Sequence, residues 1–116
     1  MTARTRRAPA MPEAAFQTRV MDTAQLFGWR RVHIRPARTD RGWRTAYEGD
    51  PGLPDLVLAR DGRVILVELK SDTGKPTLDQ QAWLNAAGPN GYLWAPGDWP
   101  RVLQVLGQVH ESEASK

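Results

Sequence analysis

The chain has 116 residues, of which 41% are hydrophobic, with a formal net charge of +3 and no cysteine. This length suits one compact domain, and the lack of cysteine excludes disulfides and zinc–thiolate sites and favours a reducing cytoplasm. No apolar run approaches the roughly 18 to 20 residues of a membrane span, and no apolar segment follows the N-terminal arginines as in a secretory signal.

The first part of the chain predicts one helix, one strand and a long loop. Residues 1–10 lack apolar periodicity and are expected to form a disordered basic arm. Apolar residues recur at helical spacing within residues 12–29, which predicts a helix that stops at Gly28. The segment "RRVHIRP" predicts a short strand at 30–36. Residues 37–52 are polar and predict a loop, and loops of this length are usually functional or mobile.

The second part predicts a hairpin followed by helix, strand and helix. Strands are expected at 56–60 and 63–70, joined by an Asp61-Gly62 turn. "VILV" at 64–67 is apolar on both faces, which predicts a central strand covered on both sides. A helix over 77–88, a strand over 91–96, a short helix from Asp98 and a polar tail at 107–116 complete the chain. The order α-β-β-β-α-β-α predicts one α/β domain over 11–106, with a mixed sheet flanked by helices.

Charge is distributed unevenly along the chain. Residues 1–44 contain ten arginines and three carboxylates, a difference of +7, whereas residues 45–116 contain six basic and ten acidic residues, a difference of −4. Thirteen of the 16 basic residues are arginine, which suits bidentate phosphate contact. This pattern fits a polyanion bound beside a metal site, although a GC-rich genome that favours arginine codons gives the same bias.

Three charges are expected at the open end of the predicted hairpin. Counting outward from the turn, Asp55 falls opposite Glu68, and Lys70 shares a strand face with Glu68. Opposed Cβ atoms lie about 4.5 to 5.5 Å apart, so the two carboxylates repel unless a proton or a cation separates them. Mg²⁺ or Mn²⁺ held by both carboxylates, a backbone carbonyl and waters is the simplest answer, with Lys70 neutralising charge or placing a water. A solvated strand end with an incidental Asp55 is the alternative.

The same residues resemble a known nuclease family. "GLPD" at 52–55, "VELK" at 67–70 and "GKPTLDQQAWL" at 74–84 closely resemble the VRR-NUC branch of the PD-(D/E)XK nuclease superfamily, in its stand-alone phage or prophage type. The opening "PEAAFQ" and the closing "YLWAPGDW" are similar as well, so the resemblance covers roughly residues 12–106. It implies a restriction-endonuclease-like core and a metal-dependent phosphodiesterase acting on DNA.

The resemblance also implies roles for individual residues. Asp55 and Glu68 would be metal ligands, the carbonyl of Leu69 would complete the shell, and Lys70 would be the catalytic lysine. Glu13 matches a helix-borne glutamate that reaches the metal directly or through water. The alternative for Glu13 is a first-turn carboxylate that only favours the helix dipole.

The role of Gln80 is open between two interpretations. Thr77 and Gln80 have the spacing of a capping box, in which Gln80 serves only its helix. In the family this glutamine lies beside the catalytic lysine and contacts substrate or water, and the two roles are compatible. Other residues have lesser expected roles: Gln81 is the register alternative, Gln17 lines the site, His33 is structural or contacts DNA, Trp83 and Leu84 belong to the core, and Trp43 stacks on a base or packs locally.

The predicted function is a metal-dependent DNA endonuclease. It is expected to select branched, flap or nicked DNA during phage or prophage replication, recombination or packaging in the bacterial host cytoplasm, with no membrane association and as a homodimer or higher oligomer. Backbone phosphates are expected to bind a set of basic residues: Arg30, Arg31, Arg35, Arg38, Arg41, Arg44 and Lys75. The alternatives are a non-cleaving DNA-binding module and an RNA-directed nuclease within a larger assembly.

Overall fold

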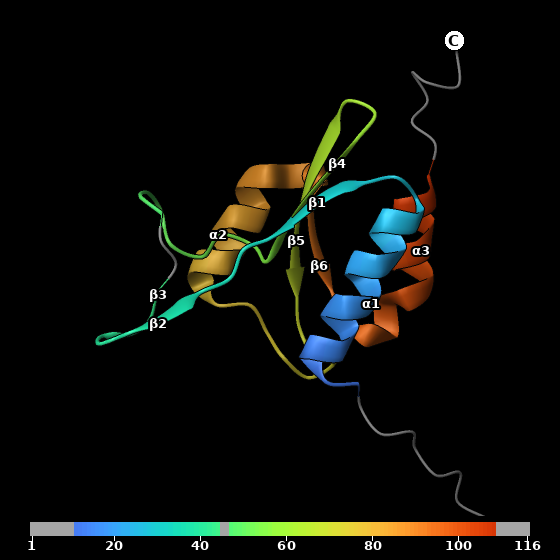
Figure 1. Cartoon of the computed structure of the whole chain (residues 1–116). Helices are drawn as coiled ribbons and strands as arrows, with labels where there is room; N and C mark the ends of the chain where they lie inside the picture. The colour runs from blue at the N-terminus through green and yellow to red at the C-terminus, as the bar shows by residue number, and fades with distance from the viewer. Residues whose placement is uncertain (1–10, 45–46, 109–116) are drawn as a thin grey trace, which may run out of the picture.

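The structure is a computed structural model that describes residues 11–44 and 47–108, with a mixed sheet between helices (Figure 1). The sheet has the strand order β1-β4-β5-β6, in which β4 pairs antiparallel with β1 and β5, and β6 runs parallel to β5. Its strands are β1 (Arg30–His33), β4 (Leu56–Arg60), β5 (Arg63–Leu69) and β6 (Gly91–Trp94). Helices α1 (Glu13–Leu26) and α3 (Trp99–Gly107) lie on one side of the sheet and α2 (Leu78–Ala87) on the other (Figure 1).

The seven predicted elements all form, in the predicted order. The prediction of a mixed sheet flanked by helices is therefore confirmed. Two 3₁₀ turns flank β6, η1 (Gly88–Asn90) and η2 (Pro96–Asp98). Asp98 belongs to η2, and its carboxylate accepts the amide of Ala95 at 2.9 Å rather than capping α3. No helix within the described ranges is long and apolar enough to cross a membrane.

The segment predicted as a polar loop contains a two-stranded sheet of its own. Strands β2 (Ala37–Thr39) and β3 (Gly42–Arg44) pair antiparallel around an Asp40-Arg41 turn. The hydroxyl of Thr39 closes this turn by accepting the amide of Arg41 and donating to the carbonyl of Gly42. Both faces of β3 are exposed, so the sequence here shows no alternation of apolar and polar residues from which a strand is predicted.

The hydrophobic core lies between the sheet and the α1/α3 layer. Phe16, Val20 and Ala24 of α1 are fully buried there because they recur at helical spacing on one face. They pack with residues of α3 and of the inward face of the sheet: Val102, Val105, Leu106, Leu56, Leu58, Ile65, Val67, Leu69 and Trp94.

The opposite face of the sheet is only partly covered. The ten-residue helix α2 contributes one buried residue, Leu84, while Val64 and Leu93 on that face are 53% and 42% exposed. Strand β5 is central, as predicted, but the expectation that "VILV" is covered on both sides is wrong at Val64, because α2 is too short to extend over it. An apolar strip of the sheet is left open.

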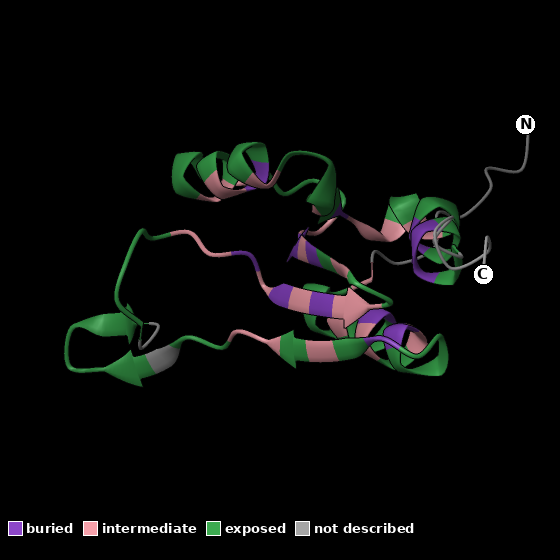
Figure 2. Ribbon diagram, turned by 90° about the horizontal axis from the view of Figure 1, so that it is seen from above, coloured by how far each residue is buried: buried purple, intermediate pink, exposed green. Residues whose placement is uncertain are grey.

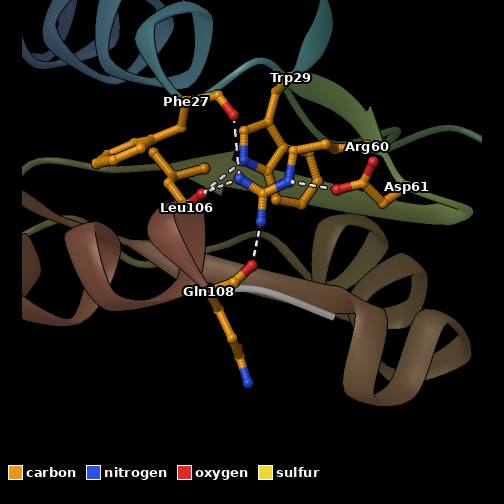
Figure 3. Close-up of polar contacts among 6 residues, drawn as sticks. All are labelled: Phe27, Trp29, Arg60, Asp61, Leu106 and Gln108. Atoms are coloured by element: carbon orange, nitrogen blue, oxygen red, sulfur yellow. Dashed lines mark hydrogen bonds and ion pairs between the residues drawn. The ribbon is translucent and has the colours of Figure 1, made fainter. Parts of the chain in front are cut away.

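Arg60 joins three elements at the turn end of the hairpin (Figure 3). Its guanidinium donates to the carbonyls of Phe27, Leu106 and Gln108, at the ends of α1 and α3, and lies 4.8 Å from the ring centroid of Trp29. Backbone carbonyls at a helix end lack partners within the helix, so a cation placed there satisfies them and favours the helix dipole. Arg60 thereby holds the helical layer on the sheet, at the end remote from Asp55.

Candidate metal centre

Two strands fix the position of Asp55. Antiparallel pairing runs without a bulge from Arg60 and Arg63 to Leu56 and Val67. Asp55 and Glu68 come next along the two segments, just beyond the last pair of the ladder, in agreement with the predicted register. The carbonyl of Asp55 accepts the amide of Ile34 at 2.7 Å, and its Oδ2 accepts the amide of Leu69 at 2.8 Å. The carboxylate is thus bound to the backbone of the strand that carries Glu68.

Glu68 is a buried carboxylate with one partner. Its side chain is 1% exposed, and Oε2 lies 3.1 Å from the Nζ of Lys70. Oε1 is buried and has no hydrogen-bond partner among the described residues. Burial, and then the charge of Asp55, raise the pKa of Glu68 to about 7 against the opposing influence of Lys70; the charge of Glu13 adds a smaller increase.

This arrangement fits a hard divalent cation. Mg²⁺ prefers oxygen ligands, and carboxylates usually supply them together with waters. A buried carboxylate oxygen without a partner is costly unless an unseen group binds it, and Asp55 provides a second carboxylate in the adjacent position. Asp55 and Glu68 are therefore the residues that would hold Mg²⁺ or Mn²⁺, with the Leu69 carbonyl as the predicted third ligand.

Glu13 lies apart from this pair. It is exposed at the start of α1, and the described residues contain no group of three or more His, Cys, Asp or Glu side chains placed to hold a metal ion. Its charge nevertheless raises the pKa of Glu68 slightly. The direct and the water-mediated interpretations of Glu13 both remain predictions.

A polar contact links α1 to β1 near Asp55. Gln17 Nε2 lies 3.0 Å from His33 Nδ1, and both side chains are half-buried. The next residue after His33 donates its amide to Asp55. This pair ties the first helix to the strand beside Asp55, in keeping with a structural role for His33.

Helix α2 and the loop before Asp55 pack against each other. Gly52 has φ +90°, and a Cβ there would lie 2.5 Å from the carbonyl carbon of Asp79. Trp83 is half-buried and donates to the carbonyl of Asp50 at 3.3 Å, so its expected place in the core is wrong, whereas Leu84 is buried as expected. The signal for this contact is the glycine of the "GLPD" motif, since only glycine fits so close an approach.

The capping box predicted for α2 is confirmed. Thr77 Oγ1 accepts the amide of Gln80, and Gln80 Oε1 accepts the amide of Thr77. Gln80 is half-buried in the first turn of α2. Its carbonyl oxygen serves the helix, which leaves the amide NH₂ as the group available for a substrate or a water.

The basic residues predicted to bind DNA fall into separate places. Arg30 and Arg31 pair with Ala59 and Leu58, towards the turn end of the hairpin. Lys75 is exposed in the loop before α2. The remaining four are exposed on β2, β3 and the adjoining chain: Arg35, Arg38, Arg41 and Arg44. The six arginines lie close together in sequence, but the structure places two of them on β1 and four on or beside β2 and β3.

The fold and the site define an α/β protein in which a buried glutamate, a half-buried aspartate and a lysine gather at one end of two adjacent antiparallel strands. No protein-family model matches the chain, and no curated protein matches its sequence.

Proposed function

We propose that the protein is a Mg²⁺- or Mn²⁺-dependent DNA endonuclease. The observation that carries this proposal is the buried Glu68 carboxylate, with Oε1 unpartnered among the described residues and Lys70 Nζ at 3.1 Å from Oε2. A structural ion pair needs neither an unsatisfied oxygen nor the second carboxylate of Asp55. A perturbed, incompletely satisfied acidic group of this kind is typical of a functional site.

The residues of the centre have distinct proposed roles. Asp55, Glu68 and the Leu69 carbonyl would hold the cation, which when bound polarises a phosphate oxygen and acidifies a water. Lys70 is oriented by Glu68 and would stabilise negative charge on the phosphate or place the attacking water. Glu13 would act through water, and the Gln80 amide would donate to substrate or water.

Substrate class and setting rest on the resemblance to VRR-NUC nucleases. Structure-selective cleavage of branched, flap or nicked DNA, in phage or prophage replication, recombination or packaging, belongs to the proposal on that ground. Exposed arginines near the centre support a polyanionic substrate, because they would bind backbone phosphates without reading sequence. Retention of Asp55, Glu68 and Lys70 together favours a cleaving enzyme over a purely binding module.

The test is cleavage of a panel of flap, junction, single-stranded and duplex DNA, with duplex RNA, in Mg²⁺, Mn²⁺ or EDTA. We expect cleavage of DNA that needs the cation and is lost in Glu68→Ala and Lys70→Ala, while DNA binding in EDTA survives. Arg101→Gln, on the exposed surface of α3, is the control variant and is expected to cleave DNA like the wild type. Cleavage that persists in both site variants contradicts the site, and cleavage of RNA alone favours the RNA-directed alternative.

Self-association is a further part of the proposal. The sheet face beside α2 leaves Val32, Val64 and Leu93 at 50%, 53% and 42% exposure, and such an apolar strip is a suitable contact between two copies. Sedimentation velocity of wild type and Val64→Lys tests this. A monomer at all concentrations in the wild type excludes it.

A further inference from the structure

The feature that the metal centre leaves unexplained is the ribbon of β2, β3 and their turn, residues 37–44, which we call the arginine ribbon. It forms a sheet separate from the main one, and its described side chains are all exposed. In Figure 2 it stands apart from the helices and the main sheet. A lone two-stranded hairpin is marginally stable in water, so an exposed ribbon of this size gains stability when it contacts a partner.

The charge of the ribbon indicates what that partner is. Arg38, Arg41 and Arg44 outnumber the single carboxylate of Asp40 by three to one. None of the three forms a salt bridge within the part of the chain that the structure describes. Guanidinium groups that are exposed and unpaired favour phosphate oxygens, which they bind with bidentate geometry.

The contact between Arg38 and Trp43 favours a duplex over a single strand. These residues are directly opposed across the ribbon, and the guanidinium carbon lies 5.9 Å from the ring centroid of Trp43. Single-strand binding relies on aromatic faces that are free to stack on bases. Here the ribbon's own cation lies over one face of the indole and is oriented by it, so only the other face of this 64% exposed ring is free to stack on a base.

The dimensions of the ribbon favour the major groove of B-form DNA. That groove admits a two-stranded β-ribbon, whereas side chains cannot enter the deep, narrow major groove of A-form RNA. The ribbon also begins beside the metal centre, since the amide of Ile34 binds the carbonyl of Asp55 at 2.7 Å. From Ile34 to the turn at Asp40 an extended chain spans at most about 20 Å, which is about six nucleotides at 3.4 Å each.

We propose that the arginine ribbon enters the major groove of double-stranded DNA up to about six base pairs to one side of the scissile phosphate. This inference rests on the proposed nuclease function and specifies its substrate as a duplex, or the duplex arm of a branched molecule. Arg38, Arg41 and Arg44 contact backbone phosphates across the groove and hold the duplex over the metal centre.

The first test measures binding in EDTA, so that its outcome does not depend on cleavage. The variant is Arg38→Gln/Arg41→Gln, and the control with the same loss of charge is Arg63→Gln/Arg101→Gln, at the hairpin turn and on α3. We expect the ribbon variant to bind duplex DNA at least about tenfold more weakly, with a salt slope smaller by about 1.8 for two lost phosphate contacts. Equal duplex affinity and slope in the two variants overturn the proposal.

The second test removes the ribbon by replacing residues 38–43 with two glycines, and follows hydrolysis of bis(p-nitrophenyl) phosphate beside that of DNA. We expect the small diester to be hydrolysed at the wild-type rate and duplex DNA to be cleaved much more slowly. Three outcomes overturn the ribbon proposal. They are an unchanged rate on duplex DNA, a loss of single-strand binding as large as the loss of duplex binding, and a loss of self-association without loss of duplex binding. Failure of the wild type to hydrolyse either substrate overturns the nuclease proposal instead.

Substrate length and groove competition sharpen the result. On duplexes that extend fewer than about six base pairs to one side of the cut, we expect the wild type and the ribbon variant to bind with similar affinity. Methyl green, which occupies the major groove, is expected to compete, and the minor-groove ligand distamycin is not. Competition by distamycin alone overturns the assignment of the groove.

Discussion

Lys70 Nζ lies 3.1 Å from Glu68 Oε2, while the other oxygen of the same buried carboxylate has no partner among the described residues. The Lys70 ammonium therefore satisfies one oxygen of a carboxylate whose charged form is already destabilised by burial. Without a metal, the ionised Glu68 carboxylate therefore lowers the free energy of unfolding by an amount that can be measured.

The first prediction concerns Glu68→Gln and pH. The folded protein raises the pKa of Glu68 from 4.5 to about 7, so the folded state holds this proton more tightly than the unfolded state. The stability gained from the proton is present below pH 4.5 and lost as pH rises to about 7, an effect of the order of 3 kcal/mol. The amide of Glu68→Gln does not titrate. We expect the variant to unfold at a higher urea concentration than wild type at pH 8 in EDTA, and at a similar concentration at pH 4.5.

Magnesium provides the control for this prediction. We expect Mg²⁺ at pH 8 to raise the melting temperature of the wild type and to leave that of Glu68→Gln unchanged, because a ligand stabilises only the state that binds it. Below saturating Mg²⁺, cleavage is also expected to rise with pH as Glu68 ionises, because the proton and the cation compete for the same carboxylate. A variant less stable than wild type at both pH values contradicts the account of Glu68.

The second prediction separates the two roles of Asp55. Asp55→Asn keeps an oxygen that accepts the amide of Leu69, whereas Asp55→Ala leaves that amide without its 2.8 Å partner. We expect Asp55→Ala to lose about 1 to 3 kcal/mol of unfolding free energy and Asp55→Asn to lose less. Both are expected to lose Mg²⁺-dependent cleavage. If Asp55→Asn keeps its cleavage rate, Asp55 is a structural residue only.

The third prediction separates capping from catalysis at Gln80. Gln80→Glu retains the oxygen that accepts the amide of Thr77 and loses the amide NH₂, so we expect unchanged thermal stability and slower cleavage at saturating DNA. Thr77→Ala removes the cap and is expected to cost about 1 kcal/mol with an unchanged maximal rate. Equal rates for Gln80→Glu and wild type would leave Gln80 with the helix cap as its sole role.

The fourth prediction concerns the packing of the loop before Asp55 on α2. A methyl group at Gly52 would lie 2.5 Å from the carbonyl carbon of Asp79, whereas at Gly49 it would meet no atom within 4 Å. Both glycines have positive φ, so Gly49→Ala reports backbone strain alone. We expect Gly52→Ala to be less stable than Gly49→Ala by about 1 to 3 kcal/mol. It should also shift the NMR resonance of the Trp83 indole N–H, which donates to Asp50. Equal stability of the two variants contradicts the close packing.

Local patterns determine much of this protein. The helical spacing of Phe16, Val20 and Ala24 predicts α1 and its buried face, and the Asp61-Gly62 turn predicts the register that opposes Asp55 to Glu68. Both follow from the sequence because side-chain direction is periodic along a helix or strand and a two-residue turn leaves little freedom in pairing. The capping box at Thr77 is equally local.

Only the tertiary structure decided how far each charge and surface is covered. Glu68 and Lys70 share a strand face, yet the Glu68 side chain is 1% exposed and the Lys70 side chain 18%. In the same way, the structure places Arg30 on the main sheet and Arg38 on the separate ribbon. It forms no group of three acidic side chains from Glu13, Asp55 and Glu68 within the described residues, and it leaves the Val64 side chain exposed. The arginine ribbon shows no pattern in sequence since it buries no described side chain. Burial depends on residues distant in the chain, so the pKa of Glu68 and the groove-sized ribbon arise only from the folded arrangement.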